Sequence, residues 1–318
     1  MKHLLVAIVM SAALLLGGNA QAYPDKTITI VVPYDAGGVV DVTARALAKH
    51  LSEKWKTSVV VENAPGAGGQ IGTSRVARAA PDGYTLLVAA DAVMAVNPFV
   101  FSKLPYKPGD FAPISSIVGA EPTLVVKKSL PVNNFAELLA LAKKQPDQLS
   151  FGSFGFATNG HLWILEMQRL AGVTFNIIHY KGVTGSLKDV VAGQIDIAFV
   201  NANSARAPMA TGLIKMLAVS GTHRKDEYPD IPTMNETLPG YAPLGWYGLW
   251  APAGTPSAII TKLNAEVREL DSSQEFQEKY LKRNSWTPIA KTPDEFQKFI
   301  EAEQARWSAV VRTFNVHL

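Results

Sequence analysis

The chain has 318 residues, with 30 Lys and Arg against 27 Asp and Glu, and it has no cysteine. A net charge of +3 gives no electrostatic footprint for nucleic acid, and the lack of thiols excludes disulfides and thiolate chemistry. A chain of this length buries enough apolar surface to fold without disulfides and is long enough for two domains.

Residues 1–22 have the pattern of an export signal. Lys2 and His3 precede a charge-free run at 4–16, and small residues follow up to an Ala-x-Ala site that ends at Ala22. The run is too short to span a bilayer, which needs about 20 apolar residues. We therefore expect a secretory signal peptide that is cleaved after Ala22, which leaves 29 Lys and Arg against 27 Asp and Glu in a periplasmic protein.

The first stretch of the mature chain predicts a strand, a turn and a helix. The β-branched run at 28–32 predicts a buried strand, Gly37 and Gly38 predict a turn, and the apolar positions after Val39 have helical spacing. Such a unit directs free backbone N–H groups toward an anion, although it is also the shape of an ordinary βα turn.

The elements that follow predict a parallel sheet with helical crossovers. A strand at 58–62, a helix at 71–79 and a strand at 84–89 continue the alternation. The glycine-rich stretch 63–69 begins like a dinucleotide fingerprint, but Ile71 stands where the third glycine belongs. We interpret this stretch as a structural turn and expect no cofactor.

The second half of the chain repeats the alternation. Strands are expected at 123–127, 149–151, 175–179, 195–200 and 214–219, with helices at 135–144, 162–170, 184–192 and 205–209. The loop 152–159 again leads a strand through glycine into a helix, with Thr158 or Asn159 as N-cap. A surface connection at 222–241 is expected to precede a strand at 245–251 and helices at 256–270, 273–283 and 293–314.

Motifs that indicate catalysis are missing from the sequence. It contains no GxxxxGK[ST], GxSxG or HExxH run, and its six histidines share no metal-ligand spacing. The sequence therefore predicts neither a metal site nor an enzyme.

Motifs spread over the mature chain match one known pattern. They include Tyr34-x-Ala36-Gly37-Gly38-x-x-Asp41, Asn63-x-Pro65-Gly66-Ala67-Gly68-Gly69, Ala80-Pro81-Asp82-Gly83-Tyr84, Pro229-Asp230-Ile231-Pro232-Thr233 and Ala251-Pro252-Ala253-Gly254-Thr255-Pro256. In combination these motifs closely resemble those of the solute-binding receptors of tripartite tricarboxylate transporters, the TctC-like or Bug family.

The resemblance implies a bilobed, type II-like periplasmic binding protein in which two doubly wound α/β lobes close on a ligand. Lobe 1 would comprise 23–122 and 246–318, and lobe 2 would comprise 123–245. The resemblance also implies a small carboxylate as the ligand, a membrane permease of the TctA/TctB type as the partner, and a monomer. Sensing is the alternative to transport, with the same fold acting as the input of a two-component sensor.

The candidate ligand-binding residues lie in the two glycine-bearing loops and at the ends of neighbouring strands. The resemblance implies that backbone N–H groups, waters and hydroxyls of these loops hold one carboxylate. The candidates are Tyr34, Asp35, Ala36, Gly37, Gly38, Val39, Asp91, Ala92, Phe154, Ala157, Thr158, Asn159, Tyr180 and Asn201. Tyr180 and Asn201 are included because they end strands of lobe 2, where open α/β sheets meet ligands.

Two acidic candidates depart from the family pattern. Asp35 and Asp91 stand in loops where members usually have uncharged residues, and a carboxylate repels an anionic ligand. One interpretation is that the ligand also carries an amine or another cationic group, which pairs with Asp35 or Asp91. The other is that each residue is solvated or caps a helix.

Two aromatic residues also allow two interpretations. Phe154 and Phe156 flank Gly155, where they are suited to stack on a planar ligand or to pack under their own helix. We expect His161, in the same region, to hold the loop rather than to contact the ligand.

Overall fold

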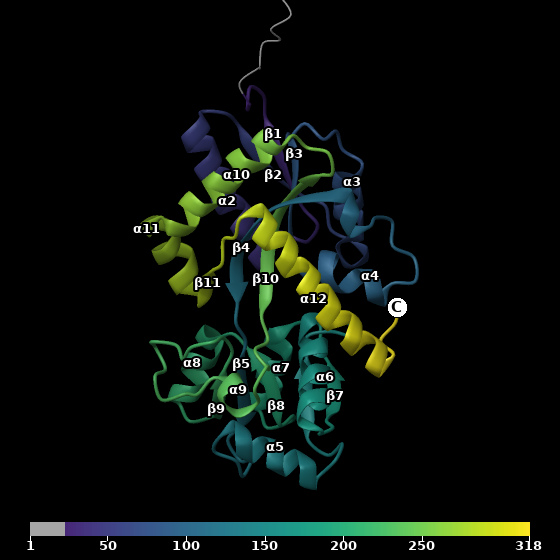
Figure 1. Cartoon of the computed structure of the whole chain (residues 1–318). Coiled ribbons are helices and arrows are strands. Elements are labelled where there is room, and N and C mark those ends of the chain that lie inside the picture. The colour runs from purple at the N-terminus through teal and green to yellow at the C-terminus, as the bar shows by residue number, and fades with distance from the viewer. Residues whose placement is uncertain (1–22) are drawn as a thin grey trace, which may run out of the picture.

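The computed structural model describes residues 23–318, so the predicted signal peptide at 1–22 lies outside the described residues. The chain forms two α/β lobes, each built on its own sheet (Figure 1). The predicted fold class, a bilobed α/β protein, is therefore confirmed. Among the described residues, no helix combines the length and the apolar character that crossing a membrane requires.

Lobe 1 contains a six-stranded sheet. Its strands are β1 (Ile28–Val32), β2 (Val59–Asn63), β3 (Thr85–Ala90), β4 (Phe111–Ala120), β10 (Gly245–Pro252) and β11 (Trp286–Pro288). Their order is β11-β4-β10-β3-β1-β2. Strand β1 is parallel to both β2 and β3, whereas β10 is antiparallel to β3 and β4.

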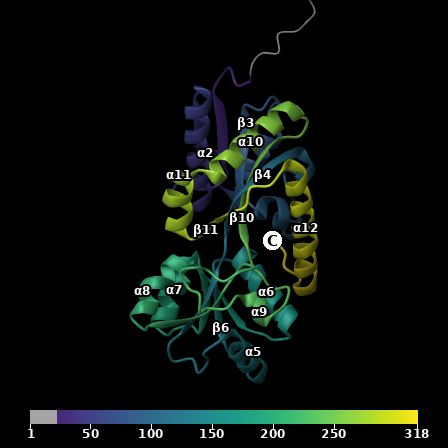
Figure 2. The same cartoon turned by 60° about the vertical axis from the view of Figure 1, so that its left-hand side comes forward.

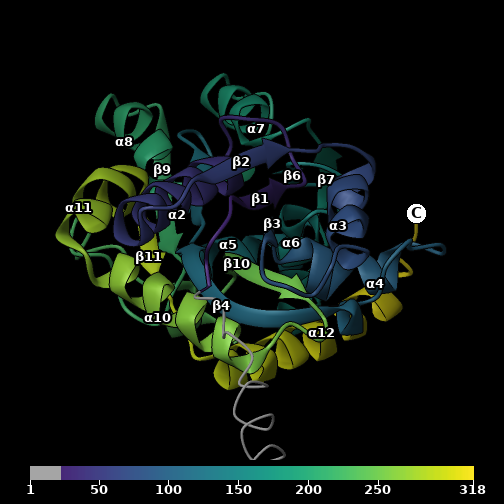
Figure 3. The same cartoon turned by 90° about the horizontal axis from the view of Figure 1, so that it is seen from above.

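Helices cover both faces of the lobe 1 sheet. They are α2 (Val39–Trp55), α3 (Gln70–Ala77), α4 (Asn97–Val100), α10 (Ser257–Ser272), α11 (Gln274–Phe276) and α12 (Pro293–Phe314), with shorter turns η1 (Ala67–Gly69), η2 (Ala92–Val96), η3 (Pro108–Asp110) and η4 (Gln277–Lys282). Side chains of β1 alternate between the two faces, because Ile30 packs with α2 and α10 while Val31 packs with α3 and α12. Figure 3 shows this division of the helices from above.

Lobe 2 contains a five-stranded sheet. Its strands are β5 (Thr123–Lys127), β6 (Ser150–Ser153), β7 (Asn176–His179), β8 (Ile197–Val200) and β9 (Ile214–Val219), in the order β7-β6-β8-β5-β9. Its helices are α5 (Phe135–Lys144), α6 (Asn159–Ala171), α7 (Val183–Val191), α8 (Ala202–Ala210) and α9 (Met234–Thr237).

The chain crosses between the sheets twice. It leaves lobe 1 between β4 and β5 through Glu121 and Pro122, and it returns between β9 and β10 through residues 220–244. Helix α12 adds a third connection, because it lies against α6 of lobe 2 (Figures 1 and 2). A continuous cluster of buried apolar side chains passes through this contact from one lobe to the other.

Three segments differ from the expectations. Residues 92–98, to which the sequence analysis assigned no element, form the π-helical η2 and the start of α4, and β11 was not predicted because it has only three residues. The expected surface connection 222–241 contains α9 and ends at Tyr241, which is fully buried. The Tyr241 hydroxyl donates a hydrogen bond to the Trp163 carbonyl at 2.8 Å, which accounts for its place in the core.

Candidate ligand-binding cleft

A cleft between the two lobes contains a cavity of about 430 Å³. Two turns line it from opposite lobes, with Tyr34, Asp35, Gly38, Val39 and Val40 from the β1–α2 turn and Phe154, Phe156, Ala157, Thr158 and Asn159 from the β6–α6 turn. Two smaller cavities of about 170 and 250 Å³ adjoin it, and Val39 lines all three. The N-termini of α2 and α6 therefore open onto the same space.

Both of these helices begin without a side-chain cap. The N-cap residue of α2 is Gly38, which has no side chain, and the N-cap residue of α6 is Thr158, whose hydroxyl accepts no hydrogen bond from its helix and instead donates to the Gly155 carbonyl at 2.8 Å. In α5, by contrast, the Asn134 side chain accepts from the Glu137 N–H. Uncapped first turns keep backbone N–H groups available, and the helix dipole favours an anion beside them.

A buried carboxylate holds the β1–α2 turn in shape. Asp41 accepts hydrogen bonds from the Gly37 N–H at 2.9 Å, from Arg45 Nε at 3.0 Å and from Asn63 Nδ2 at 2.9 Å. Burial alone raises the pKa of Asp41, but these three hydrogen bonds outweigh burial and lower it. The Gly37 N–H thus supports the turn itself, and the φ of +88° explains why glycine stands there.

A neutral histidine holds the β6–α6 turn. The Ala157 N–H donates to His161 Nδ1 at 3.1 Å, as expected for a residue that shapes the loop. The His161 ring lies against the rings of Phe156 and His179, with centroid distances of 5.0 and 4.7 Å. Burial and the neighbouring His179 lower the pKa of His161 to about 4, so that its Nδ1 remains an acceptor at neutral pH.

Asp91 lies at the end of β3 and is fully buried, so its interpretation as a solvated loop residue is wrong. Both of its carboxylate oxygens accept from Asn159 Nδ2, at 2.7 and 2.8 Å, which joins lobe 1 to lobe 2 across the cleft. Burial raises the pKa of Asp91 to about 7 against the opposing effect of this hydrogen bond, and Glu303 adds to the rise. Asp35, by contrast, is exposed on the rim.

The rest of the cavity wall is largely aromatic and apolar. Phe154 lines the cavity and also packs edge-on against Trp163 of its own helix, at a centroid distance of 5.6 Å. Phe156 lines the same wall and is 45% exposed. Further lining residues that the sequence analysis missed are Gly68, Asn97, Phe101, Tyr247 and Leu318. They reach the cavity from separate parts of lobe 1, and Gly68 belongs to the glycine-rich stretch 63–69, which the sequence analysis interprets only as a structural turn.

The remaining candidate ligand-binding residues differ in which cavity they line. Ala92 lines the main cavity, while Gly37 and Asn201 line the adjoining cavity of about 250 Å³. Ala36 and Tyr180 line none of the three cavities. The Tyr180 hydroxyl donates instead to Asp189 at 2.7 Å.

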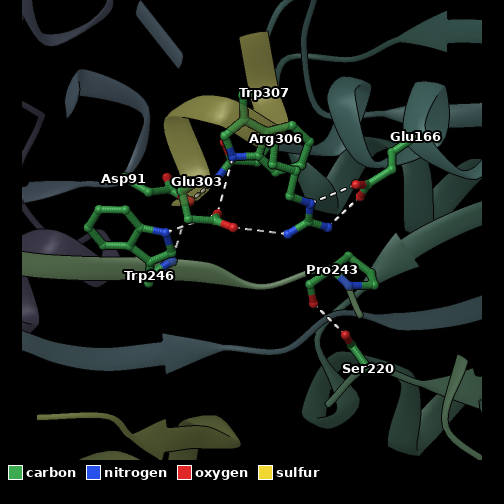
Figure 4. Close-up of polar contacts among 9 residues, drawn as sticks. Asp91, Glu166, Ser220, Pro243, Trp246, Glu303, Arg306 and Trp307 are labelled. Atoms are coloured by element: carbon green, nitrogen blue, oxygen red, sulfur yellow. Dashed lines mark hydrogen bonds and ion pairs between the residues drawn. The ribbon is translucent and has the colours of Figure 1, made fainter. Parts of the chain in front are cut away.

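A buried polar network joins the lobes beside the cleft (Figure 4). Arg306 of α12 forms an ion pair with Glu166 of α6, with Nε 2.7 Å from Oε1, and a second contact with Glu303 at 3.2 Å. Glu303 also accepts from the indole N–H groups of Trp246 at 3.3 Å and Trp307 at 3.2 Å. The helix whose N-terminus lines the cavity is thereby fixed to lobe 1.

Comparison with known proteins identifies the family. A family model described as "Tripartite tricarboxylate transporter family receptor" matches residues 43–316. Protein BugT of Bordetella pertussis is 33% identical over 297 residues, which cover 92% of this chain and 91% of BugT.

Solved structures agree with this match. A protein of R. palustris solved with adipate has 33% identity and a TM-score of 0.78, over 93% of this chain and 100% of that one. MatC from Rhodopseudomonas palustris with bound malate has 29% identity and a TM-score of 0.71, over 91% and 100%. The chain belongs to the tripartite tricarboxylate transporter receptor (TctC) family of solute-binding proteins, which are receptors rather than enzymes.

Proposed function

We propose that this protein is a periplasmic receptor that captures a small carboxylate in the interlobe cleft and delivers it to a tripartite transporter permease of the TctA/TctB type. The observation that carries the proposal is that the uncapped N-termini of α2 and α6 open onto one cavity from opposite lobes. The relatives solved with adipate and malate support a carboxylate ligand. The transporter family supports uptake over the sensor alternative.

Capture would work by closure of the lobes. A carboxylate that accepts from the first turns of α2 and α6 gains both sets of hydrogen bonds only when the lobes are closed. A ligand shifts a conformational equilibrium by its difference in affinity for the two states, so this double contact would favour the closed form. Exclusion of water strengthens the same hydrogen bonds.

The residues of the cavity wall also indicate which groups the ligand carries besides its carboxylate. Phe154, Phe156 and Tyr247 provide rings against which an apolar or aromatic carbon frame would pack. The acidic residues Asp35 and Asp91 suggest an additional amine. We therefore propose a small carboxylate that carries an aromatic or an amine group.

A proline scan of the helix N-termini tests the anion site. Proline is tolerated at the first helical position but removes its N–H, and Gly38 has the extended backbone that a residue before proline prefers. Val39→Pro should therefore fold and weaken carboxylate binding about tenfold or more in calorimetry, since hydrogen bonds to charged groups are strong. Val39→Ala keeps the backbone N–H, so it should lose less carboxylate affinity than Val39→Pro.

The matched control is Gln274→Pro, which places proline at the first position of α11, on an exposed residue outside the three cavities. It should bind like the wild type. The ligand panel consists of adipate, malate, glutarate, benzoate and glutamate, and at least one should bind with micromolar or tighter affinity. If none of these acids binds, the proposed function is wrong.

A further inference from the structure

The charged side chains that line the main cavity all have the same sign. Asp35 and Asp91 are lining residues, whereas the lining set contains no Lys, Arg or His. The guanidinium of Arg306 lies nearby but already pairs with Glu166 and Glu303. A buried carboxylate without a cationic partner is unfavourable, because burial removes its hydration. The free receptor therefore has a negative site that a positively charged group would neutralise.

The side-chain oxygen of Asn159 is a buried acceptor without a donor, and it belongs to the residue that contacts the Asp91 carboxylate. The Nδ2 atom of Asn159 donates to both oxygens of Asp91, and this orientation turns the Oδ1 atom away from the carboxylate. The Oδ1 atom is buried and has no hydrogen-bond partner within the described part of the chain. Buried acceptors almost always have a donor, so this atom points to a donor that the protein does not itself supply.

We propose that Asp91 and Asn159 recognise a protonated amine, so that the receptor captures an amino carboxylate rather than a simple acid. The inference rests on the proposed function, which assigns the carboxylate end of the ligand to the helix N-termini. An ammonium group has three N–H donors and no acceptor. It therefore matches one amide oxygen and one carboxylate on two residues that line the cavity, both closed to solvent in this structure, and its charge offsets that of Asp91.

The proposal excludes the exposed Asp35 as the main partner. An amine that pairs with a rim carboxylate in water gains little, because solvent screens the interaction. Asp91 is fully buried at the end of β3, and Asn159 is in the first turn of α6. An amine held by both residues would add to the contact that Asp91 and Asn159 already make between the lobes and so favour the closed form.

Proton release on binding gives the proposal a specific signature. The ionisable groups around Asp91 are Tyr34, Tyr247 and Glu303, so no neighbouring cation among the described residues stabilises its charge. Because the pKa of Asp91 is raised to about 7, an ammonium ligand should ionise it and release about half a proton at pH 7. A simple diacid should instead cause proton uptake.

Matched ligand pairs test the inference by calorimetry at pH 7. The pairs are aspartate with malate, glutamate with glutarate, and 6-aminohexanoate with hexanoate. In at least one pair the amino member should bind about tenfold tighter or more. Asp91→Asn should remove this preference. The control is Asp271→Asn, since Asp271 is also buried and its pKa is also raised to about 7, but it lies outside the cavity.

The outcomes separate the two proposals. If the amine-free acids bind as tightly as their amino partners, the inference is wrong while the proposed function stands. If no member of any pair binds, the inference is wrong, and the proposed function is wrong as well only if adipate and benzoate also fail to bind. If Asp91→Asn does not fold, wild-type titrations in two buffers with different heats of ionisation decide the matter. Proton release with the amino ligands supports the inference, and uptake or no change overturns it.

Discussion

Arg306 of α12 and Glu166 of α6 form a partly buried ion pair between the two lobes, with Nε 2.7 Å from Oε1. Only 3% of the Glu166 side chain is exposed, so the carboxylate depends on this partner. The pair fixes the middle of α6 to lobe 1, whereas the N-terminus of α6 lines the ligand cavity. Movement of the lobes must therefore keep α6 and α12 in contact or break this pair.

Removal of the guanidinium should destabilise the protein strongly. Arg306→Ala leaves Glu166 buried without its partner, and we expect a loss of about 3–5 kcal/mol in the free energy of unfolding. Glu278→Gln is the control, because the Glu278–Lys282 pair is exposed and should contribute less than about 1 kcal/mol. Urea denaturation of the three proteins measures the difference. Equal stability of Arg306→Ala and the wild type would contradict the role of the pair.

Acid should loosen the β6–α6 turn through His161. The pKa of His161 is lowered from 6.5 to about 4 in the folded protein, so the unfolded chain binds the proton more readily. The contribution of neutral His161 to the free energy of unfolding is therefore present above pH 6.5 and is lost as the pH falls toward 4. The loss amounts to about 3 kcal/mol at most.

The measurement is the free energy of unfolding between pH 4 and pH 7. Relative to the wild type, His161→Asn should lose less stability or gain more on acidification, by up to about 3 kcal/mol at pH 4, whereas His223→Asn, at an exposed position, should follow the wild type. Ligand affinity should fall over the same range, because protonated His161 no longer accepts the Ala157 N–H. A wild-type slope in His161→Asn would show that another group causes the pH dependence.

Two adjacent glycines should respond differently to alanine. Gly37 has a φ of +88°, so Gly37→Ala forces an alanine into the left-handed region and should cost about 1 kcal/mol of stability. Gly38 has a φ of −78°, and an added Cβ would lie 4.0 Å from its nearest neighbour, the Asp35 carbonyl oxygen. Gly38→Ala should therefore fold normally.

The same two variants should separate stability from binding. Gly38 lines the main cavity, so the added methyl group of Gly38→Ala occupies ligand space and should weaken binding severalfold at unchanged melting temperature. Thermal melts and calorimetry of both variants provide the comparison. A stable Gly37→Ala would contradict the assigned backbone strain, and full affinity in Gly38→Ala would move the ligand away from this turn.

Local sequence signals determined most of the secondary structure. The strand at 28–32, the helix from Val39 and the helix at 293–314 form where apolar spacing and capping residues predict them. These features depend on residues a few positions apart, so they are readable along the chain. The strand–glycine–helix pattern marked the two turns that line the cleft, and the family resemblance implied the bilobed fold.

The tertiary structure alone decided the chemistry of the site. Asp91 and Asn159 are 68 residues apart, and Arg306 and Glu166 are 140 apart. Whether a carboxylate is solvated or buried depends on which distant segments fold over it, and its pKa follows from that burial. For the same reason the sequence placed Tyr180 among the ligand contacts, while the fold turns its hydroxyl toward Asp189. Sequence spacing fixes which face a residue occupies, but only packing fixes its neighbours.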